Sequence, residues 1–487
     1  MPNRISRPNI VFLLPLALTL YLFAAPVRQA HKQNSSGQES KVKIQPVSSH
    51  LILITISGLR SDFITSAESY RLRIPTIQSL RTKGSYAVGT ESVFPSQTIP
   101  AHATMITGTL PADHGITSDY AFNEKDAIQL EEPYKSAKEI KTDTICQAAR
   151  RMNLITAAVG FPLTAGAAIN FNLPDDVEDV KVEKEGSLDQ PTRAQSSTPP
   201  ELRNEILSAL KDESDRKLLD ESKKFPNFAK DSFKASAAAY LIEKHHPNLL
   251  LINFTSFDDV QRRYGLLSAE SLRSLELIDG LVKKIVDATE RSRIAEKTTF
   301  IVISDHGAAK VEKEFNPNVL LAKKGWLTSD SQGRIISWRA VAQSFGGAAA
   351  IFVRDPQDED FVREVEAFFD QQAEKPDSPI WRVIPKRDAT KLGADPRVAL
   401  YLDAAPSHAI SAKTTGSSVT GAAFRTAHGY APSRAEMRAA FIIAGNGIKS
   451  GSKLEYARLI DIAPTIARLL GLEMKTARGR VIAEVIK

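Results

Sequence analysis

Phe94-Pro-Ser-Gln-Thr-Ile-Pro-Ala-His-Ala-Thr-Met-Ile-Thr-Gly108 is the stretch around which the rest of this 487-residue chain is organised. Two prolines bracket the hydroxyl residue Thr98, and Pro100 lies where the first turn of a helix tolerates it, so Thr98 is predicted at or just before a helix N-terminus. Free N–H groups and the positive end of the helix dipole collect there, and both favour an anionic phosphoryl group. A capping threonine before an ordinary helix is the alternative. The rest of the chain decides between the two.

The composition is that of a globular protein, with 42% hydrophobic and 25% charged residues. A net charge of +6 without a dense block of Lys and Arg does not predict nucleic-acid binding. The single cysteine, Cys146, excludes an internal disulfide and any cysteine-based zinc site.

Residues 1–30 are predicted to direct export, because two arginines precede an apolar run over residues 10–25. The run is short for a full membrane span. The small residues near its end fit a cleavage site poorly, so a cleaved signal peptide and a retained membrane anchor both stay open. Residues 31–47 are polar and are predicted to be a solvated linker. The protein is therefore expected outside the cytoplasm, either periplasmic, secreted or membrane-anchored and facing outward.

Strand and helix patterns alternate over residues 48–487, which we predict to be the folded domain. Continuous apolar, β-branched runs predict buried strands over residues 51–56, 155–160, 248–254, 298–303 and 439–444. Helical spacing of apolar residues predicts helices over residues 74–83, 143–152, 231–244, 268–290 and 461–470. This alternation predicts an α/β fold with a mainly parallel central sheet and helices on both faces. The pattern weakens over about residues 172–225, which we expect to form an insertion or smaller cap.

Polar candidates follow several of the predicted strands. Ser57, Asp258 and the pair Asp305-His306 each come a few residues after a strand. In open α/β sheets, ligand chemistry collects beyond the carboxyl ends of the strands. We therefore expect these side chains to lie together near Thr98.

The chain resembles the type I phosphodiesterase/nucleotide pyrophosphatase family of the alkaline phosphatase superfamily. The blocks that carry the resemblance keep the family's order and cover residues 54–62, 94–116, 258–265, 302–307, 428–430 and 459–471. The resemblance implies an alkaline-phosphatase-like fold and a hydrolase that holds two zinc ions. In such an enzyme a threonine attacks phosphorus, and water then resolves the phosphothreonine. It also implies a phosphoester or nucleotide-like small molecule as substrate.

Carried over by position, the resemblance assigns a role to five residues. Thr98 matches the nucleophile, and Asp305 and His306 match two ligands of the metal that activates it. Asp258 and His428 match two ligands of the other metal. Asp259 is an alternative to Asp258 if the match slips by one residue. With one cysteine in the chain, Asp and His side chains are the plausible zinc ligands.

Three functional positions depart from the family. Ser57 stands where the family has an Asp ligand, and its neutral hydroxyl is a poor substitute. Arg262 stands where the family has a His ligand, and a fixed cation repels Zn²⁺. Asp119 stands where the family has an Asn that donates a hydrogen bond to the phosphoryl oxygen, which a carboxylate cannot do unless it is protonated.

Two rearrangements would compensate for these departures. Arg262 could pair with Asp258 and replace the charge of the second metal, or Asp119 could become a new ligand of the metal beside Thr98. The sequence therefore predicts hydrolysis with altered or weakened metal sites. The alternative is a catalytically inactive member of the fold that binds a phosphoester or a partner. A sulfatase is excluded, because the run from Thr98 to His102 lacks the required Cys/Ser-x-Pro-x-Arg pattern.

Overall fold

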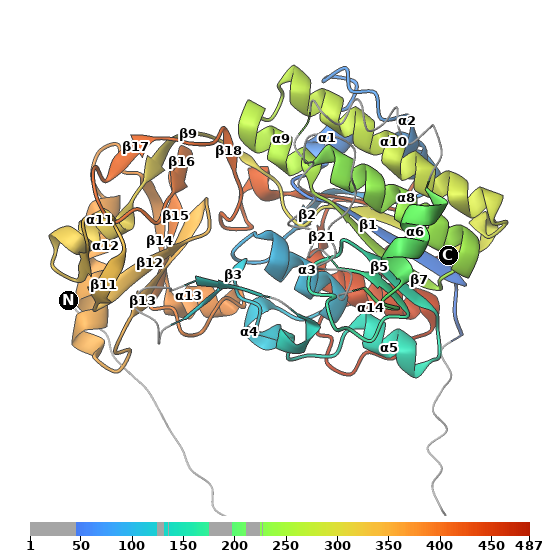
Figure 1. Ribbon diagram of the computed structural model, residues 1–487. Helices are drawn as coiled ribbons and strands as arrows, with labels where there is room; N and C mark the ends of the chain where they lie inside the picture. The colour runs from blue at the N-terminus through green and yellow to red at the C-terminus, as the bar shows by residue number, and fades with distance from the viewer. Residues whose placement is uncertain (1–44, 124–130, 135, 175–196, 211–224, 226) are drawn as a thin grey trace, which may run out of the picture. The chain divides into compact units, whose positions relative to one another are not determined.

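The computed structural model describes residues 45–123, 131–134, 136–174, 197–210, 225 and 227–487 (Figure 1). The predicted export segment 1–30 and most of the linker 31–47 lie outside the described residues, as does much of the predicted insertion 172–225. Within the described ranges, every helix is too short or too polar to cross a lipid bilayer.

A nine-stranded sheet forms the centre of the fold, in the order β20-β2-β19-β8-β1-β7-β5-β6, with β21 also paired to β2. Its strands are β1 (His50–Ile56), β2 (Ser85–Glu91), β5 (Thr156–Val159), β6 (Phe171–Leu173), β7 (Leu249–Phe254), β8 (Thr298–Ile303), β19 (Ala439–Gly445), β20 (Lys453–Leu454) and β21 (Ala457–Arg458). Strand β19 runs antiparallel to β2 and β8, and the other pairs are parallel. The prediction of a mainly parallel sheet is confirmed, and all five predicted strands belong to it.

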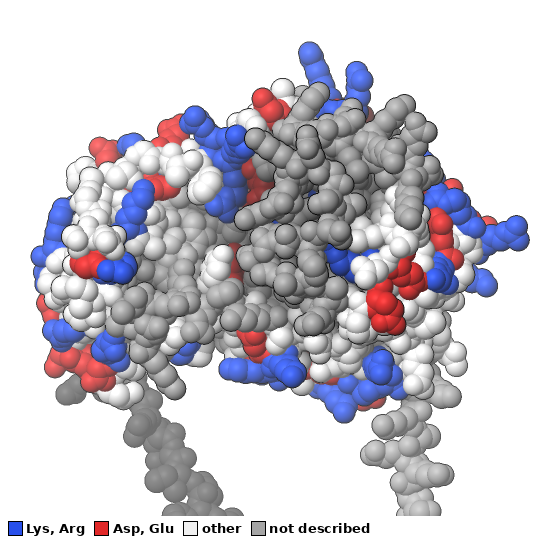
Figure 2. Space-filling model, in the orientation of Figure 1, with Lys and Arg blue, Asp and Glu red and all other residues white. Residues whose placement is uncertain are grey.

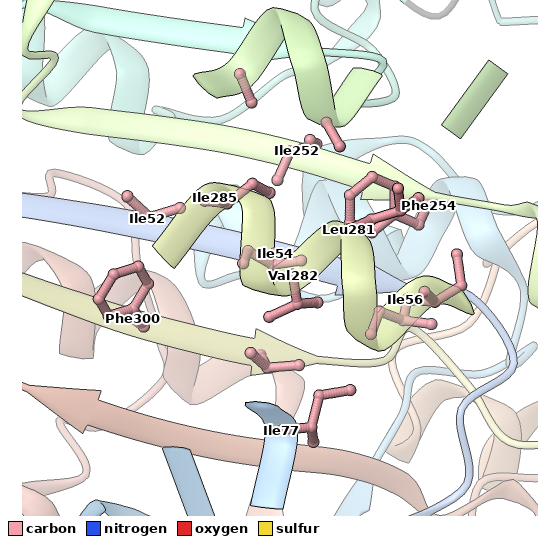
Figure 3. Packing of buried hydrophobic residues seen from close by; sticks show 14 of the residues in the cluster. Ile52, Ile54, Ile56, Ile77, Ile252, Phe254, Leu281, Val282, Ile285 and Phe300 are labelled. Carbon is pink, nitrogen blue, oxygen red and sulfur yellow. The ribbon is translucent and has the colours of Figure 1, made fainter. Parts of the chain in front are cut away.

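Helices cover both faces of this sheet (Figure 1). One face carries α2 (Pro75–Lys83), α8 (Phe228–His245) and α10 (Ala269–Arg291), and the other carries α3 (Thr98–Thr107), α5 (Ile145–Arg151) and α14 (Ile462–Leu470). Figure 3 shows how Ile52, Ile54 and Ile56 of β1 pack against Leu281, Val282 and Ile285 of α10. Burying one such side chain contributes about 1.5–3 kcal/mol. The sheet is therefore a rigid support for whatever its strand ends carry.

A second hydrophobic core is built mainly by residues between the end of β8 and the start of β19, together with Phe94 and Phe122. Its antiparallel sheet has the order β12-β13-β15-β14, formed by β12 (Ala340–Ser344), β13 (Ala348–Val353), β15 (Leu400–Ala404) and β14 (Ile380–Pro385), and α12 (Glu359–Ala373) packs on it. Strand β9 (Ala309–Phe315) leads into this region, and β18 (Thr426–Ala427) pairs with β9 on the way out. The sequence pattern does not separate this second core from the main domain. It predicts a smaller cap at residues 172–225, where the described residues form β6 and α6 (Leu202–Ala209).

Helix α3 begins where the proline pattern predicted. Gln97 is its N-cap residue in extended conformation, Thr98 is its first residue, and Gly108 ends it with a φ of +66°. A left-handed backbone of this kind suits glycine. Thr98 thus stands at the N-terminus of a ten-residue helix that packs under the sheet.

Candidate functional site

The central strands carry most of the candidate residues to one edge of the sheet. Strands β7, β1 and β8 are neighbours, and their parallel pairing puts their carboxyl ends side by side. Ser57 directly follows β1, the pair Asp305-His306 follows β8, and α9 (Ser256–Tyr264) follows β7 and carries Asp258 and Arg262. His428 comes from the other direction, just after β18. The expectation that chemistry gathers beyond the strand ends agrees with this placement.

Thr98 and His306 form the central contact of the site. The Thr98 Oγ1 atom lies 3.1 Å from His306 Nε2. The other ring nitrogen, His306 Nδ1, lies 2.8 Å from the carbonyl oxygen of Gly307. A carbonyl oxygen only accepts, so Nδ1 must carry a proton. In the neutral ring, Nε2 is then the acceptor and the Thr98 hydroxyl donates to it.

The Gly307 carbonyl can lie beside His306 Nδ1 because Gly307 has no side chain to collide with the backbone at Glu436. A Cβ atom at this position would lie 2.0 Å from the carbonyl oxygen of Glu436, far inside contact distance. Its N–H also donates to the carbonyl of Met437, at 3.2 Å. The turn after β8 is thus fitted against the segment that leads into β19.

Asp305 is held rigidly through one oxygen and left open at the other. Its Oδ1 accepts from the N–H groups of Gly58, at 3.2 Å, and of His306, at 3.0 Å. Its Oδ2 lies 3.4 Å from His306 Nε2 and accepts no hydrogen bond from the described residues. Burial alone would raise the pKa of Asp305, but the neighbouring rings of His306, His102 and His428 hold it at about 2. The side chain is therefore an anion at neutral pH.

His428 and Asp258 form the other side of the site. The rings of His306 and His428 stack with centroids 3.9 Å apart. Among the described residues, neither His428 Nδ1 nor Asp258 Oδ1 has a hydrogen-bond partner, although both are buried. Burial lowers the pKa of His428 well below its usual value and raises that of Asp258 to about 6. Buried polar atoms without partners mark a place that is arranged for a ligand.

Asp259 is not the inward carboxylate. Its side chain accepts a hydrogen bond from Asn227 Nδ2, at 2.6 Å, and is partly exposed. Asp258 is buried, and its Oδ1 lies 2.6 Å from the point where a Cβ on Gly58 would sit. Gly58 also binds Asp305, so Asp258 is the residue that faces the site.

Asp119 takes a position at the N-terminus of α3. Its Oδ1 accepts the N–H of Ile99 at 2.8 Å, and its own N–H donates to the side chain of Gln97. Burial raises the pKa of Asp119 to about 6, although the Ile99 N–H and the charges of His306 and Arg262 act against it. The Asp119 carboxylate thus occupies the Ile99 N–H, which would otherwise donate a hydrogen bond to an incoming phosphoryl oxygen.

The first compensating rearrangement, an ion pair between Arg262 and Asp258, is not formed. In the part of the chain that the structure describes, the Arg262 guanidinium lies in no ion pair with Asp258 or with any other carboxylate; it lies over Phe424, 4.5 Å from the ring centroid. Ser57 Oγ makes one long contact of 3.4 Å to Asn253 Oδ1. Asp119 is bonded through Oδ1 to the N–H of Ile99, and its role as a new metal ligand stays a prediction.

The family resemblance implies two zinc ions, and the spacing of the donor atoms shows which of them the site fits. A tetrahedral zinc with bonds of about 2.0–2.2 Å separates its ligand atoms by roughly 3.3–3.6 Å. His306 Nε2 and Asp305 Oδ2 lie 3.4 Å apart, within this range, so these two atoms are spaced for one ion beside the threonine. Thr98 Oγ1, at 3.1 Å from His306 Nε2, is at hydrogen-bond distance. The position between Asp258 and His428 does not fit a second ion, because Arg262 brings a positive charge in place of a ligand. No three His, Cys, Asp or Glu side chains of the described residues gather as a metal site.

Sequence reasoning missed several residues that shape the site. Asn253 holds Ser57, Gln261 donates to the carbonyl of Gly58 at 3.1 Å, and Phe424 supports Arg262. Gly307 had a visible signal, since it completes Asp-His-Gly after a strand. The others had none, because the contacts join segments that lie far apart in the chain.

The sheet order and the placement of the site define an alkaline-phosphatase-like α/β protein. The chain belongs to the type I phosphodiesterase/nucleotide pyrophosphatase family, whose model matches residues 51–431.

Relatives and solved structures agree with this assignment. Human ectonucleotide pyrophosphatase/phosphodiesterase family member 1 is 23% identical over 259 residues, which are 53% of this chain and 23% of the human protein. Mouse family member 7 is 21% identical over 309 residues, which are 62% of this chain and 54% of the mouse protein. The structure of murine ectonucleotide pyrophosphatase/phosphodiesterase 5 superposes with a TM-score of 0.62 at 15% identity, covering 90% of this chain and all of that one. A further structure of the murine protein is described as an inactive threonine-to-alanine variant in complex with AMP.

The chain matches only part of most of these curated relatives. The match covers 23% of the length of the human protein and 54% of the length of mouse family member 7. The structural likeness, at 15% identity, establishes the fold.

Changing Ser57 to Asp together with Arg262 to His is expected to raise the bound zinc by at least one ion per chain. The double variant supplies a carboxylate and an imidazole where the wild type has a neutral hydroxyl and a fixed cation. Elemental analysis after exposure to excess zinc and desalting measures the change. The pair Ser331→Asp with Arg363→His, both on the exposed surface, is the matched control. An unchanged zinc content in the first double variant would contradict the prediction.

Proposed function

We propose that this protein is an exported phosphoester hydrolase of the phosphodiesterase/nucleotide pyrophosphatase type. It binds a nucleotide-like phosphoester and passes its phosphoryl group to Thr98, with metal sites that are weaker than those of its relatives. The observation that carries the proposal is the contact of Thr98 Oγ1 with His306 Nε2 at the N-terminus of α3. The inactive threonine-to-alanine variant of the murine protein, in complex with AMP, supports the choice of both nucleophile and ligand class.

Helix α3, His306, Asp305 and Thr98 have different roles in the proposed transfer of the phosphoryl group. Helix α3 directs its N-terminal N–H groups and the positive end of its dipole at the phosphoryl oxygens. His306 orients the Thr98 hydroxyl through Nε2, which is the nearest base for its proton when it binds no cation; with a cation on Nε2, the lowered pKa of the hydroxyl would release the proton to water instead. A divalent cation bound by Asp305 and His306, with zinc as the family's choice, would lower the pKa of the hydroxyl and polarise the phosphoryl group. Oxygen of Thr98 then forms a bond to phosphorus as the bond to the leaving alcohol or phosphate breaks.

Water completes the reaction by displacing Thr98 from phosphorus. We assign this water to the side of the site formed by Asp258 and His428. The buried atoms Asp258 Oδ1 and His428 Nδ1 have no hydrogen-bond partner among the described residues and are suited to hold a water molecule. Release of phosphate or a phosphomonoester restores the Thr98 hydroxyl.

The location outside the cytoplasm is part of the proposal. Residues 1–30 direct export, as a cleaved signal peptide or as a membrane anchor, and residues 31–47 link that segment to the folded domain. N-terminal sequencing of the mature protein distinguishes the two forms. A mature protein that is found in the cytoplasm would contradict the export.

A non-catalytic role is the second candidate, and the position of the Asp119 carboxylate at the N-terminus of α3 favours it. Its carboxylate already accepts the Ile99 N–H at 2.8 Å and brings a negative charge to the place of the phosphoryl group. The domain would then bind a phosphoester or a partner and leave it intact.

Trapping the covalent intermediate tests the proposal. The protein is mixed with bis(p-nitrophenyl) phosphate, quenched with acid and analysed by peptide mass spectrometry. A phosphoryl ester on Thr98 is the expected result. Saturable binding of AMP with no modified threonine and no release of nitrophenol would establish the non-catalytic role, and the absence of both binding and turnover would overturn both.

A further inference from the structure

Arg262 lies one helical turn beyond Asp258 on α9, so the two side chains share a face of that helix. Asp258 in turn approaches Gly58, which binds Asp305 beside the Thr98–His306 contact. The Arg262 side chain is half-buried. Its position therefore places a permanent positive charge at the border of the site, on the side of Asp258 and His428.

The guanidinium of Arg262 lies against an aromatic ring, and its N–H groups make no hydrogen bond to the described residues. The group lies over the Phe424 ring at 4.5 Å, and the backbone carbonyl of Arg262 accepts the N–H of Arg425 at 2.7 Å. Among the described residues, no hydrogen bond or ion pair uses the N–H groups of the guanidinium. The cation thus lies against the face of an aromatic ring, while its five N–H donors remain available for an oxyanion.

An open hollow gives an anion access to these N–H groups. It has a volume of about 640 Å³ and is lined by Asn227, Asp259, Arg262, Arg263, Ala423 and Phe424. Figure 2 shows positively charged side chains gathered where α9 and β18 meet. The acidic group in the lining, Asp259, is already bonded to Asn227. The hollow is thus a cationic opening at Arg262, one helical turn from Asp258, within the range of volumes that small-molecule pockets have.

The charge of Arg262 acts on several groups of the site. It lowers the pKa of Asp258 and of Asp119, in both cases against the larger effect of burial, and it also contributes to the low pKa of His428. Asp119 accepts the N–H of Ile99, the residue that follows Thr98. A phosphoryl group at Thr98 would lie within the same field.

We infer that Arg262 binds a phosphoryl oxygen of the substrate directly, so that a guanidinium takes over at this site the charge that a second metal ion supplies in the family. The inference rests on the proposed function only in that it takes the Thr98 pocket as a phosphoester site. It explains why Arg262 neither pairs with Asp258 nor leaves the pocket for bulk water. The site then needs at most one metal ion to bind its substrate.

Calorimetric titration with inorganic phosphate tests this inference. The protein is stripped of metal with a chelator and supplied with one equivalent of zinc. Arg262→Met, which keeps a long side chain over Phe424, is expected to bind phosphate at least tenfold more weakly than the wild type. Arg262→Lys keeps the charge but loses the planar fork of donors, and is expected to bind phosphate with an affinity between those of the wild type and Arg262→Met. Arg363→Ala, on the exposed face of α12, is the control for a change in net charge.

Equal phosphate affinity in the wild type and in Arg262→Met would overturn the inference, as would a wild type that needs a second equivalent of zinc. The result is independent of turnover. Phosphate binding that depends on Arg262, without phosphothreonine on Thr98, would keep the inference and reject the hydrolase. Phosphothreonine with unchanged binding in Arg262→Met would do the reverse.

Discussion

Replacement of Thr98 with alanine is expected to reduce hydrolysis of bis(p-nitrophenyl) phosphate to the uncatalysed rate, a loss of ~10³-fold or more. The substitution removes the hydroxyl that His306 Nε2 contacts at the helix N-terminus. Alanine is a good helix former, and the partly exposed Thr98 side chain contributes little to the core. The variant should therefore fold normally and retain AMP binding, so that the loss is one of chemistry.

Two further variants sharpen this test. Thr98→Ser keeps a hydroxyl in place and should retain part of the activity. Thr390→Ala, on the exposed side of α13 (Lys386–Lys391), removes a threonine hydroxyl far from the site and should change nothing. Full turnover in Thr98→Ala would sink the assignment of the nucleophile, whatever the other variants do.

Replacement of Asp119 with asparagine is expected to raise phosphoester affinity and turnover, by about 10²-fold for a gained hydrogen-bond donor to the transition state. Asparagine keeps an oxygen that accepts the Ile99 N–H, and so preserves the end of α3. Its amide adds a donor and removes the negative charge that repels the phosphoryl group. Steady-state kinetics with the phosphodiester measure the gain, and Asp370→Asn on the exposed face of α12 is the control.

The pH dependence of phosphodiester affinity shows whether the charge of Asp119 or its shape is responsible for the effect of Asp119→Asn. Burial raises the pKa of Asp119 to about 6, so its carboxyl takes up a proton as the pH falls through that value. The affinity of the wild type for a phosphodiester, which stays a monoanion in this range, should rise from pH 8 to pH 5 by more than that of Asp119→Asn. Parallel profiles for the two proteins would show that Asp119 does not oppose the ligand.

The stability of the fold should also depend on the protonation of Asp119. The pKa of Asp119 is higher in the folded state than its usual value of 3.8, so the ionised group destabilises the fold above pH 6. That cost disappears as the pH falls from 6 to below 4. Asp119→Asn should therefore have a higher Tm than the wild type at pH 8, and the difference should shrink toward pH 4. Thermal unfolding at several pH values measures it.

The sheet could be predicted from the sequence because its strands are buried on both faces. Runs such as Leu51 to Ile56 and Leu249 to Phe254 are apolar throughout, and the helices between them have clear spacing. The place of Thr98 was also readable, since Pro100 and Gly108 mark the two ends of its helix. Local signals of this kind act over a few residues and do not depend on the rest of the fold.

The second core and the fine contacts of the site could not be predicted in this way. The strands β12 and β13 pair only with other strands of their own region, so their apolar runs look like additional members of the main sheet. The position of Arg262 over Phe424 joins residues that are far apart in sequence. Whether Arg262 pairs with Asp258 or stacks on an aromatic ring is a question of distance, which no periodicity records.

The fit of Gly307 against Glu436 has a consequence for how defects in this protein will be recognised. The carbonyl that sets the protonated nitrogen of His306 belongs to a glycine whose place is fixed by the backbone of residues 436 and 437. A substitution that shifts this segment would leave the sheet folded and every site residue present, yet would turn the histidine away from Thr98. Such a lesion, more than a hundred residues distant in sequence, would be scored in a genetic screen as a loss of the nucleophile itself.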